Sequence, residues 1–170
     1  MHRAILLSLC LCAGCFDKDD TGSDGEDFVR ATIDGEAYSD GGGAAFFASS
    51  DPAWLLLFPA EQLQGSVLGW TEGQTGAWDL AFEEACEDDC NWLQYQVGGA
   101  TWVSASGSLT IDAWTAHTPE NEFDARIGTI EGTFSSSLSC WMGCDTTEGT
   151  IEITDGSFRS IVVQTADKGK

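Results

Sequence analysis

Apolar and polar residues alternate along most of this chain, in short runs separated by Gly, Asp, Ser and Asn. A period of two is typical of half-buried β-strands. The first such run places Val29, Ala31 and Ile33 on one face of a strand, and Asp34-Gly35 ends that strand as a turn. The pattern predicts an all-β fold, with a single turn around Pro59 to Leu63 as the only helical candidate.

The order of the apolar runs predicts how several strands are connected. Ala53 to Pro59 (AWLLLFP) is apolar enough to be buried on both faces, which is typical of a central strand. Leu68 to Trp70 and Trp78 to Phe82 flank the turn-like sequence EGQTG and therefore predict a hairpin. Gly128 predicts a bulge, because the apolar residue before it breaks the parity of those after it. Asp155-Gly156 predicts a turn before the last strand.

These runs amount to about ten strands with little helix, joined by short turns. That count predicts an antiparallel β-sandwich or barrel-like domain, and the spacing does not decide between the two. Residues 28–166 are enough for one domain with a real core and leave no room for a second. Residues 167–170 are expected to be a C-terminal tail.

The first fifteen residues combine a charged start, an apolar stretch and a short motif that ends in cysteine. Met1-His2-Arg3 is positively charged, Ala4 to Leu11 is apolar, and Cys12-Ala13-Gly14-Cys15 follows with small residues before the last cysteine. The segment is similar to the lipobox of bacterial lipoprotein signal peptides. The resemblance implies that residues 1–14 are removed and that Cys15 carries a diacylglycerol. Because Cys12 stands where Leu is usual, ordinary secretory cleavage is the alternative.

Residues 15–27 are expected to be the lipidated cysteine and a disordered acidic tether. FDKDDTGSDGED has too little apolar surface to offset the entropy of ordering it. No run in the chain reaches the roughly 20 apolar residues of a membrane-spanning helix, so the predicted anchor is acylated Cys15 in the lipid bilayer. Phe16 rather than Asp after that cysteine agrees with the outer-membrane sorting rule of some bacteria. The expected location is therefore the cell envelope, at the outer membrane.

Four segments of the domain carry a further resemblance. FVRATIDGEAYSD, GSLTIDAW, ARIGTIEGTFSSSL and GTIEITDGSF are similar to a group of uncharacterised all-β domains of bacterial lipoproteins. The resemblance covers about half of the domain and implies an all-β fold at the cell surface. It carries over no catalytic residue, because that group has no established activity.

Four of the seven cysteines lie inside the predicted domain, as Cys86, Cys90, Cys140 and Cys144. An even number in an exported protein predicts two disulfides. Local pairing within each Cys-x-x-x-Cys is slightly favoured, and crossed pairing between the two loops is the alternative. A four-cysteine zinc site is a further alternative, although it usually has two-residue spacings.

The chain is strongly acidic, with a net charge of -21 and no Lys or Arg between Arg30 and Arg126. A surface with so few cations excludes nucleic acid as a partner. The densest carboxylate cluster, EEACEDDC, could hold Ca²⁺, which takes six to eight oxygen ligands, or be a solvated acidic loop. The candidate calcium ligands are Glu83, Glu84, Glu87, Asp88 and Asp89. No other cofactor is predicted.

The seven tryptophans could pack in the core or form a platform that stacks against sugar rings. Trp70 and Trp78 share the parity of aliphatic neighbours, which predicts a core position. Trp102 and Trp114 lie opposite the aliphatic faces of their strands and are the better candidates for exposure. The core interpretation is favoured for the set as a whole.

Catalysis has little support in the sequence. His117 is the only histidine outside the predicted signal segment, and it lies in a polar loop, where a solvated imidazole is expected. None of the hydrolase or phosphate-binding motifs occurs. We therefore expect an envelope lipoprotein with a non-enzymatic binding or structural role and an unknown protein or glycan partner. A carbohydrate- or Ca²⁺-dependent binding module is the first alternative, and a carboxylate-dependent hydrolase is the second.

The lipobox predicts that Cys15→Ser abolishes lipidation. Metabolic labelling with a fatty-acid analogue should mark the natural chain and leave the variant unlabelled, because the thioether requires the Cys15 sulfur. The variant should also leave the membrane fraction, whereas Cys12→Ser should stay there. Unchanged labelling of the Cys15 variant would contradict the prediction.

Overall fold

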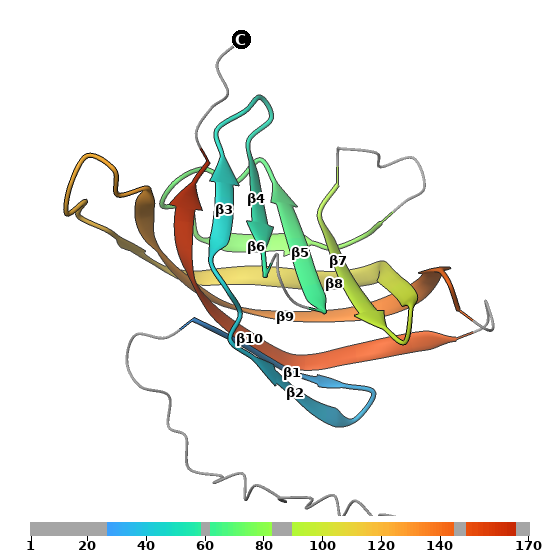
Figure 1. The fold of residues 1–170 in the computed structure, drawn as a ribbon. Coiled ribbons are helices and arrows are strands. Elements are labelled where there is room, and N and C mark those ends of the chain that lie inside the picture. Colours follow the sequence, from blue (N-terminus) through green and yellow to red (C-terminus); the bar gives the residue numbers. More distant parts are fainter. Residues whose placement is uncertain (1–26, 59–61, 83–89, 145–148, 166–170) are drawn as a thin grey trace, which may run out of the picture.

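The structure is a computed structural model that describes residues 27–58, 62–82, 90–144 and 149–165. Within these ranges it contains ten β-strands and no helix, which confirms the all-β prediction (Figure 1). No helix in this part of the chain could span a membrane. The strands are β1 (Phe28–Ile33), β2 (Glu36–Asp40), β3 (Ala45–Ala48), β4 (Trp54–Leu57), β5 (Leu63–Leu68), β6 (Gly76–Asp79), β7 (Trp92–Val97), β8 (Ala100–Ala116), β9 (Arg126–Met142) and β10 (Thr150–Gln164).

The strands form one sheet that closes on itself. The hydrogen-bonded order β10-β3-β4-β5-β7-β8 is completed by β9, which pairs with both β8 and β10. The arrangement is therefore barrel-like, which resolves the choice that the spacing left open. Only the pairing of β3 with β10 is parallel, and every other pairing is antiparallel.

Two long strands change partners along their length. Residues Ile153 to Arg159 of β10 pair with β1, and its last residues, Val162 to Gln164, pair with β3. Similarly, the start of β8 pairs with β7, and Ser108 to Ile111 pair with β6. The short strands β3, β4, β5 and β7 consequently cross over the long strands β8, β9 and β10 (Figure 1).

One side chain bridges the gap between the two partners of β10. Asp27 accepts a hydrogen bond from the backbone N–H of Ile161 at 2.9 Å. Ile161 lies between Arg159, which pairs with Phe28, and Val162, which begins the pairing with β3. The carboxylate thus satisfies a backbone donor that neither neighbouring strand reaches.

The core fills the space between the crossing strands. Leu55, Leu57, Leu63 and Leu93 from the short strands are fully buried. From the long strands, Ile130, Phe134, Leu138, Phe158 and Val162 belong to the same apolar cluster. Alternate residues along each strand supply this core, so the remaining residues of every short strand face outward.

Two predictions of turns were wrong. The segments on either side of EGQTG do not form a hairpin, because β5 pairs with β4 and β7, whereas β6 pairs with β8. Asp155-Gly156 is a bulge inside β10, between the pairs Ile153 with Ser136 and Gly156 with Phe134. The positive φ of Asp155, 53°, suits a bulge as well as a turn, so the dipeptide alone does not distinguish them.

Other local predictions fared better. Gly128 of β9 pairs with Val162 of β10, and Arg126 pairs with Val163. Ile127 therefore has no partner in β10 and is the extra residue of the predicted bulge. β4 has a strand on each side, as predicted, but its outward residues are only half-buried. The helical turn predicted around Pro59 to Leu63 falls mostly outside the described residues, and Leu63 itself begins β5.

Gly132 of β9 lies so close to β8 and β10 that we expect no larger residue to be accepted at this position. A Cβ there would collide with the carbonyl oxygen of Thr110 and lie 2.7 Å from the Phe158 ring. We expect Gly132→Ala to lower the free energy of unfolding by about 2 kcal/mol, as overpacking does. Gly41→Ala is the matched control, because a Cβ at Gly41 meets no atom within 4 Å. Urea denaturation of the two variants measures the difference, and equal stabilities would contradict the proposed clash.

Candidate binding face

The outward residues of β3, β4, β5 and β7 form a surface that we call the neutral face. We include the half-buried ones and leave out exposed Gln96, and none of those included belongs to the central core. Buried and half-buried residues alternate along β3, β4 and β5 and at the start of β7, so the outward set follows directly from the buried one. The neutral face consists of Phe46, Ala48, Trp54, Leu56, Gln64, Ser66, Leu68, Trp92 and Gln94.

Cross-strand pairing arranges these residues in rows. One row runs from Phe46 to Leu56, Ser66 and Trp92 across four strands. Beside it, Trp54 pairs with Leu68. On its other side, Gln64 pairs with Gln94, and the Gln94 Nε2 donates a hydrogen bond of 2.8 Å to the Gln64 Oε1. An apolar band with two indoles is therefore bordered by a row of amides.

Charge is absent from the strands of this face. β3, β4, β5 and β7 contain no Asp, Glu, Lys or Arg, and neither do residues 100–111 of β8 or 132–142 of β9. The whole chain carries 28 acidic and seven basic residues, so the charges of the barrel are concentrated elsewhere. A neutral area on a strongly acidic surface is an unusual feature, because solvent normally favours charge on an outward face.

The uncharged area continues from β7 across β8 to the end of β9. Val103, which pairs with Gln94 and Ser139, is only 5% exposed although it lies outside the central core cluster. At the end of β9, the ring of Trp141 packs against that of Phe82, with the two ring centroids 5.5 Å apart. Trp141 itself is 53% exposed, the highest exposure of a tryptophan in the described residues.

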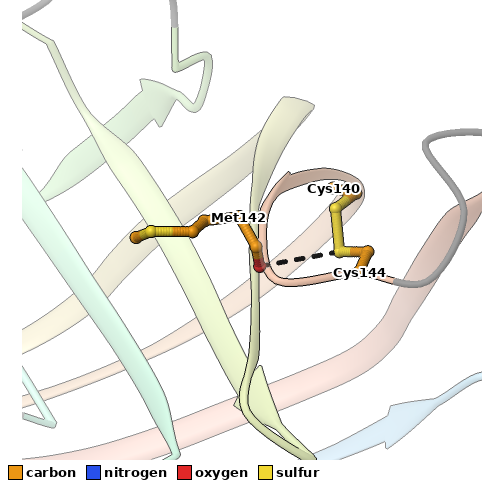
Figure 2. Close-up of a disulfide and its surroundings, with 3 residues drawn as sticks. All are labelled: Cys140, Met142 and Cys144. Carbon is orange, nitrogen blue, oxygen red and sulfur yellow. Dashed lines mark hydrogen bonds between the residues drawn. A yellow bond between two sulfur atoms is a disulfide. The ribbon is translucent and has the colours of Figure 1, made fainter.

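A disulfide closes the end of this area. Cys140 and Cys144 are bonded, with their Cα atoms 6.2 Å apart, which confirms the local pairing for this loop. Figure 2 shows the Met142 side chain pointing away from the disulfide, and the Met142 carbonyl oxygen lies 3.7 Å from the Cys144 Sγ. A five-residue loop of this kind stabilises the fold by about 2 kcal/mol in the chain-entropy model. It also restrains Trp141 next to Cys140.

The other cysteines are described only in part. Cys90 is disulfide-bonded, and its predicted partner Cys86 lies outside the described residues. The crossed pairing does not apply to Cys140 and Cys144, because these two bond each other. Their sulfurs are also not the thiolates that the zinc alternative requires.

Several other predicted site residues lie outside the described residues. These are the lipidation candidate Cys15 and the calcium candidates Glu83, Glu84, Glu87, Asp88 and Asp89. Within the ranges 27–58, 62–82, 90–144 and 149–165, no group of three or more His, Cys, Asp or Glu could hold a metal ion. The calcium hypothesis therefore rests on the sequence alone.

The predicted exposure of Trp102 and Trp114 was wrong. Both pack against the core, and the Trp114 ring lies 5.7 Å from that of buried Trp70. The pairing of β8 with β9 shows the cause, because Ala105 and Asp112 are extra residues in β8. Each bulge inverts the inward parity of the strand, so that a tryptophan on the apparent outer face turns inward. The core position of Trp70 and Trp78 is confirmed.

A shallow groove adds to the neutral surface at the turn between β7 and β8. It has a volume of about 410 Å³ and is lined by Gln62 and residues 96–101. All of these residues are uncharged, and their polar groups are amides, a hydroxyl and the backbone of two glycines. The groove thus has the same chemical character as the neutral face.

A second organised cluster lies in the loop between β8 and β9, residues 117–125. The Asp124 carboxylate accepts hydrogen bonds from His117 Nε2 at 2.7 Å and from Arg126 Nε and Nη2 at 2.8 and 2.9 Å. It also accepts the backbone N–H groups of Glu120 and Arg126. His117 is therefore not the solvated loop imidazole that the sequence suggested, and its partner seven residues away carries no recognisable spacing signal.

The hydrogen bonds of the loop cluster shift the pKa values of Asp124 and Arg126 so that both groups stay charged. The bonds from Arg126 and His117 hold the pKa of Asp124 well below its ordinary value, and Asp124 in turn raises the pKa of Arg126. Among the described contacts, no hydroxyl or thiol bonds to His117. The cluster has the geometry of a clamp that fixes the loop, rather than that of a nucleophile and its base.

No family model, curated protein sequence or solved structure matches this chain. The choice between candidate sites therefore depends on the geometry and chemistry of its own residues. Of the two, the neutral face presents side chains outward, whereas the loop cluster satisfies its polar groups internally.

The clamp predicts an acid-sensitive loop. Because the folded-state pKa of Asp124 is depressed, its stabilising effect is present at pH values above about 4, the ordinary range of Asp, and is lost as the pH falls further. Asp124→Asn should lower Tm at pH 7, and the difference from the natural chain should shrink below pH 4. Glu122→Gln removes the same charge from the same loop and should leave Tm unchanged. A pH-independent effect of Asp124→Asn would contradict the clamp.

Proposed function

We propose that this chain is a lipid-anchored protein of the cell envelope whose barrel-like domain is a non-enzymatic binding module. The lipobox-like segment ending at Cys15 supports the anchor and the envelope location. The neutral face is the proposed binding surface. In this arrangement the acidic tether holds the domain close to the bilayer, and the domain recruits or retains a second envelope component.

The observation that carries the proposal is the absence of charge from the strands of the neutral face. The core does not require apolar residues at these positions, because none of the half-buried residues Trp54, Leu56 and Trp92 packs into it. Aromatic residues without charged neighbours are the composition that distinguishes the centre of binding surfaces. Exposing apolar side chains to water is unfavourable, and a ligand that covers them removes this unfavourable contact.

A non-enzymatic role is supported by the loop cluster. His117, Asp124 and Arg126 are interconnected titratable side chains, and the hydrogen bonds between them are used within the loop. The neutral face contributes amides and indoles, which bind but do not transfer protons at neutral pH. The carboxylate-dependent hydrolase remains the less favoured alternative.

Site-specific photo-crosslinking in the native cells tests the binding surface. A benzophenone amino acid at Ser66 or Gln94 should give a crosslinked product, because both positions lie on the neutral face. The same amino acid at Thr133, an exposed position on β9, should give none. Equal products from all three positions, or none from Ser66 and Gln94, would contradict the proposed surface.

A further inference from the structure

The neutral face offers two indoles at a spacing that suits an extended ligand. Trp54 and Trp92 lie two strands apart and in adjacent outward rows. With strands about 4.8 Å apart and about 3.4 Å per residue along each, their backbone positions are about 12 Å apart. A single small molecule does not cover both rings, whereas a chain of several linked units does.

The absence of charge restricts the chemistry of that ligand. An anionic polymer or lipid headgroup requires Lys or Arg, and a cation requires carboxylates, but the strands of the face carry neither. A neutral ligand is the one class that meets no unpaired charge there. It would also be held with little dependence on salt, because no ion pair contributes.

Amides beside aromatic rings favour a ligand with both hydroxyls and apolar faces. Gln94 uses one N–H on Gln64, which orients its amide, and its carbonyl oxygen and second N–H can still bond to a ligand. Ser66 adds a hydroxyl between the indoles. A hydrocarbon surface would leave these polar groups unsatisfied on contact, which is unfavourable.

The half-buried state of the rings argues in the same direction. Trp54 on β4 and Trp92 on β7 are half-buried, so most of each side chain packs against its neighbours rather than projecting from the surface. Insertion into a bilayer requires projecting apolar groups. A flat surface of indole and amide groups instead matches the flat, CH-rich faces and hydroxyl rims of linked pyranose rings.

We propose that the neutral face binds an uncharged polysaccharide, with Trp54 and Trp92 stacking against its sugar rings and Gln94 bonding to its hydroxyls. This assignment rests on the proposed binding function and names the ligand class for the same surface. The area around Phe82 and Trp141 extends the surface in the direction of β9.

The test uses the full lipidated chain in a polyoxyethylene detergent, which does not present sugars. The probes are an array of neutral oligosaccharides and insoluble cellulose, chitin and mannan. We expect retention on at least one probe that survives 0.5 M NaCl. Trp92→Ala should weaken it at least tenfold, and Phe123→Ala, which removes an 86% exposed ring in the loop between β8 and β9, should leave it unchanged.

Gln94→Leu separates a sugar ligand from a lipid surface and guards against misfolding of the tryptophan variant. Loss of the amide should weaken polysaccharide binding and leave binding to phosphatidylcholine vesicles, measured with the unlipidated Cys15→Ser chain, unchanged. If the face contacted lipid instead, the added apolar side chain would strengthen vesicle binding. Strengthened vesicle binding would overturn the assignment in favour of a lipid surface. Crosslinks from Ser66 and Gln94 without retention on any probe would overturn the polysaccharide and leave the binding surface intact. Absence of both would remove the two proposals together.

Discussion

The closure of the sheet depends on β8 and β10, each of which bonds to one strand along an earlier segment and to another along a later one. Because β9 lies between them and bonds to both along nearly its whole length, the three strands form a continuous support. Because β10 changes its partner to β3 and β8 begins paired with β7, the strands β3, β4, β5 and β7 can cross the core on the side opposite the three long strands. Without these changes, the same strands would extend an open sheet with no enclosed core.

Bulges are what allow the long strands to bend around that core. Asp155 in β10, Ile127 in β9, and Ala105 and Asp112 in β8 are all extra residues relative to their partners. Each of them increases the local twist and inverts the face on which later side chains lie. The positions of Trp102 and Trp114 against the core follow from this inversion, and so does the restriction of outward tryptophans to the shorter strands and to the end of β9.

Local patterns in the sequence therefore predicted strands better than partners. The first strand, the approximate strand count and the bulge at Gly128 follow from parity and turn residues that neighbour each other in the chain. The hairpin after Leu68 was wrong because β6 bonds to Ser108–Ile111, about 30 residues further along, and no local signal encodes that choice. The neutral face could have been found by collecting the outward parity of β4, β5 and β7, but only once their adjacency was known. The partner of His117 depends on how a loop folds, which spacing does not reveal.

The ring leaves two open edges among the described strands, at β2 and β6, which each bond to a single neighbour. Both are short, and both carry carboxylates, as Glu36 and Asp40 on β2 and Asp79 on β6. With the lipid anchor proposed above, diffusion would be confined to two dimensions and copies of the chain would meet one another frequently. Like charges on the exposed edges would keep such encounters brief, so that crowding on the bilayer does not become strand-to-strand polymerisation.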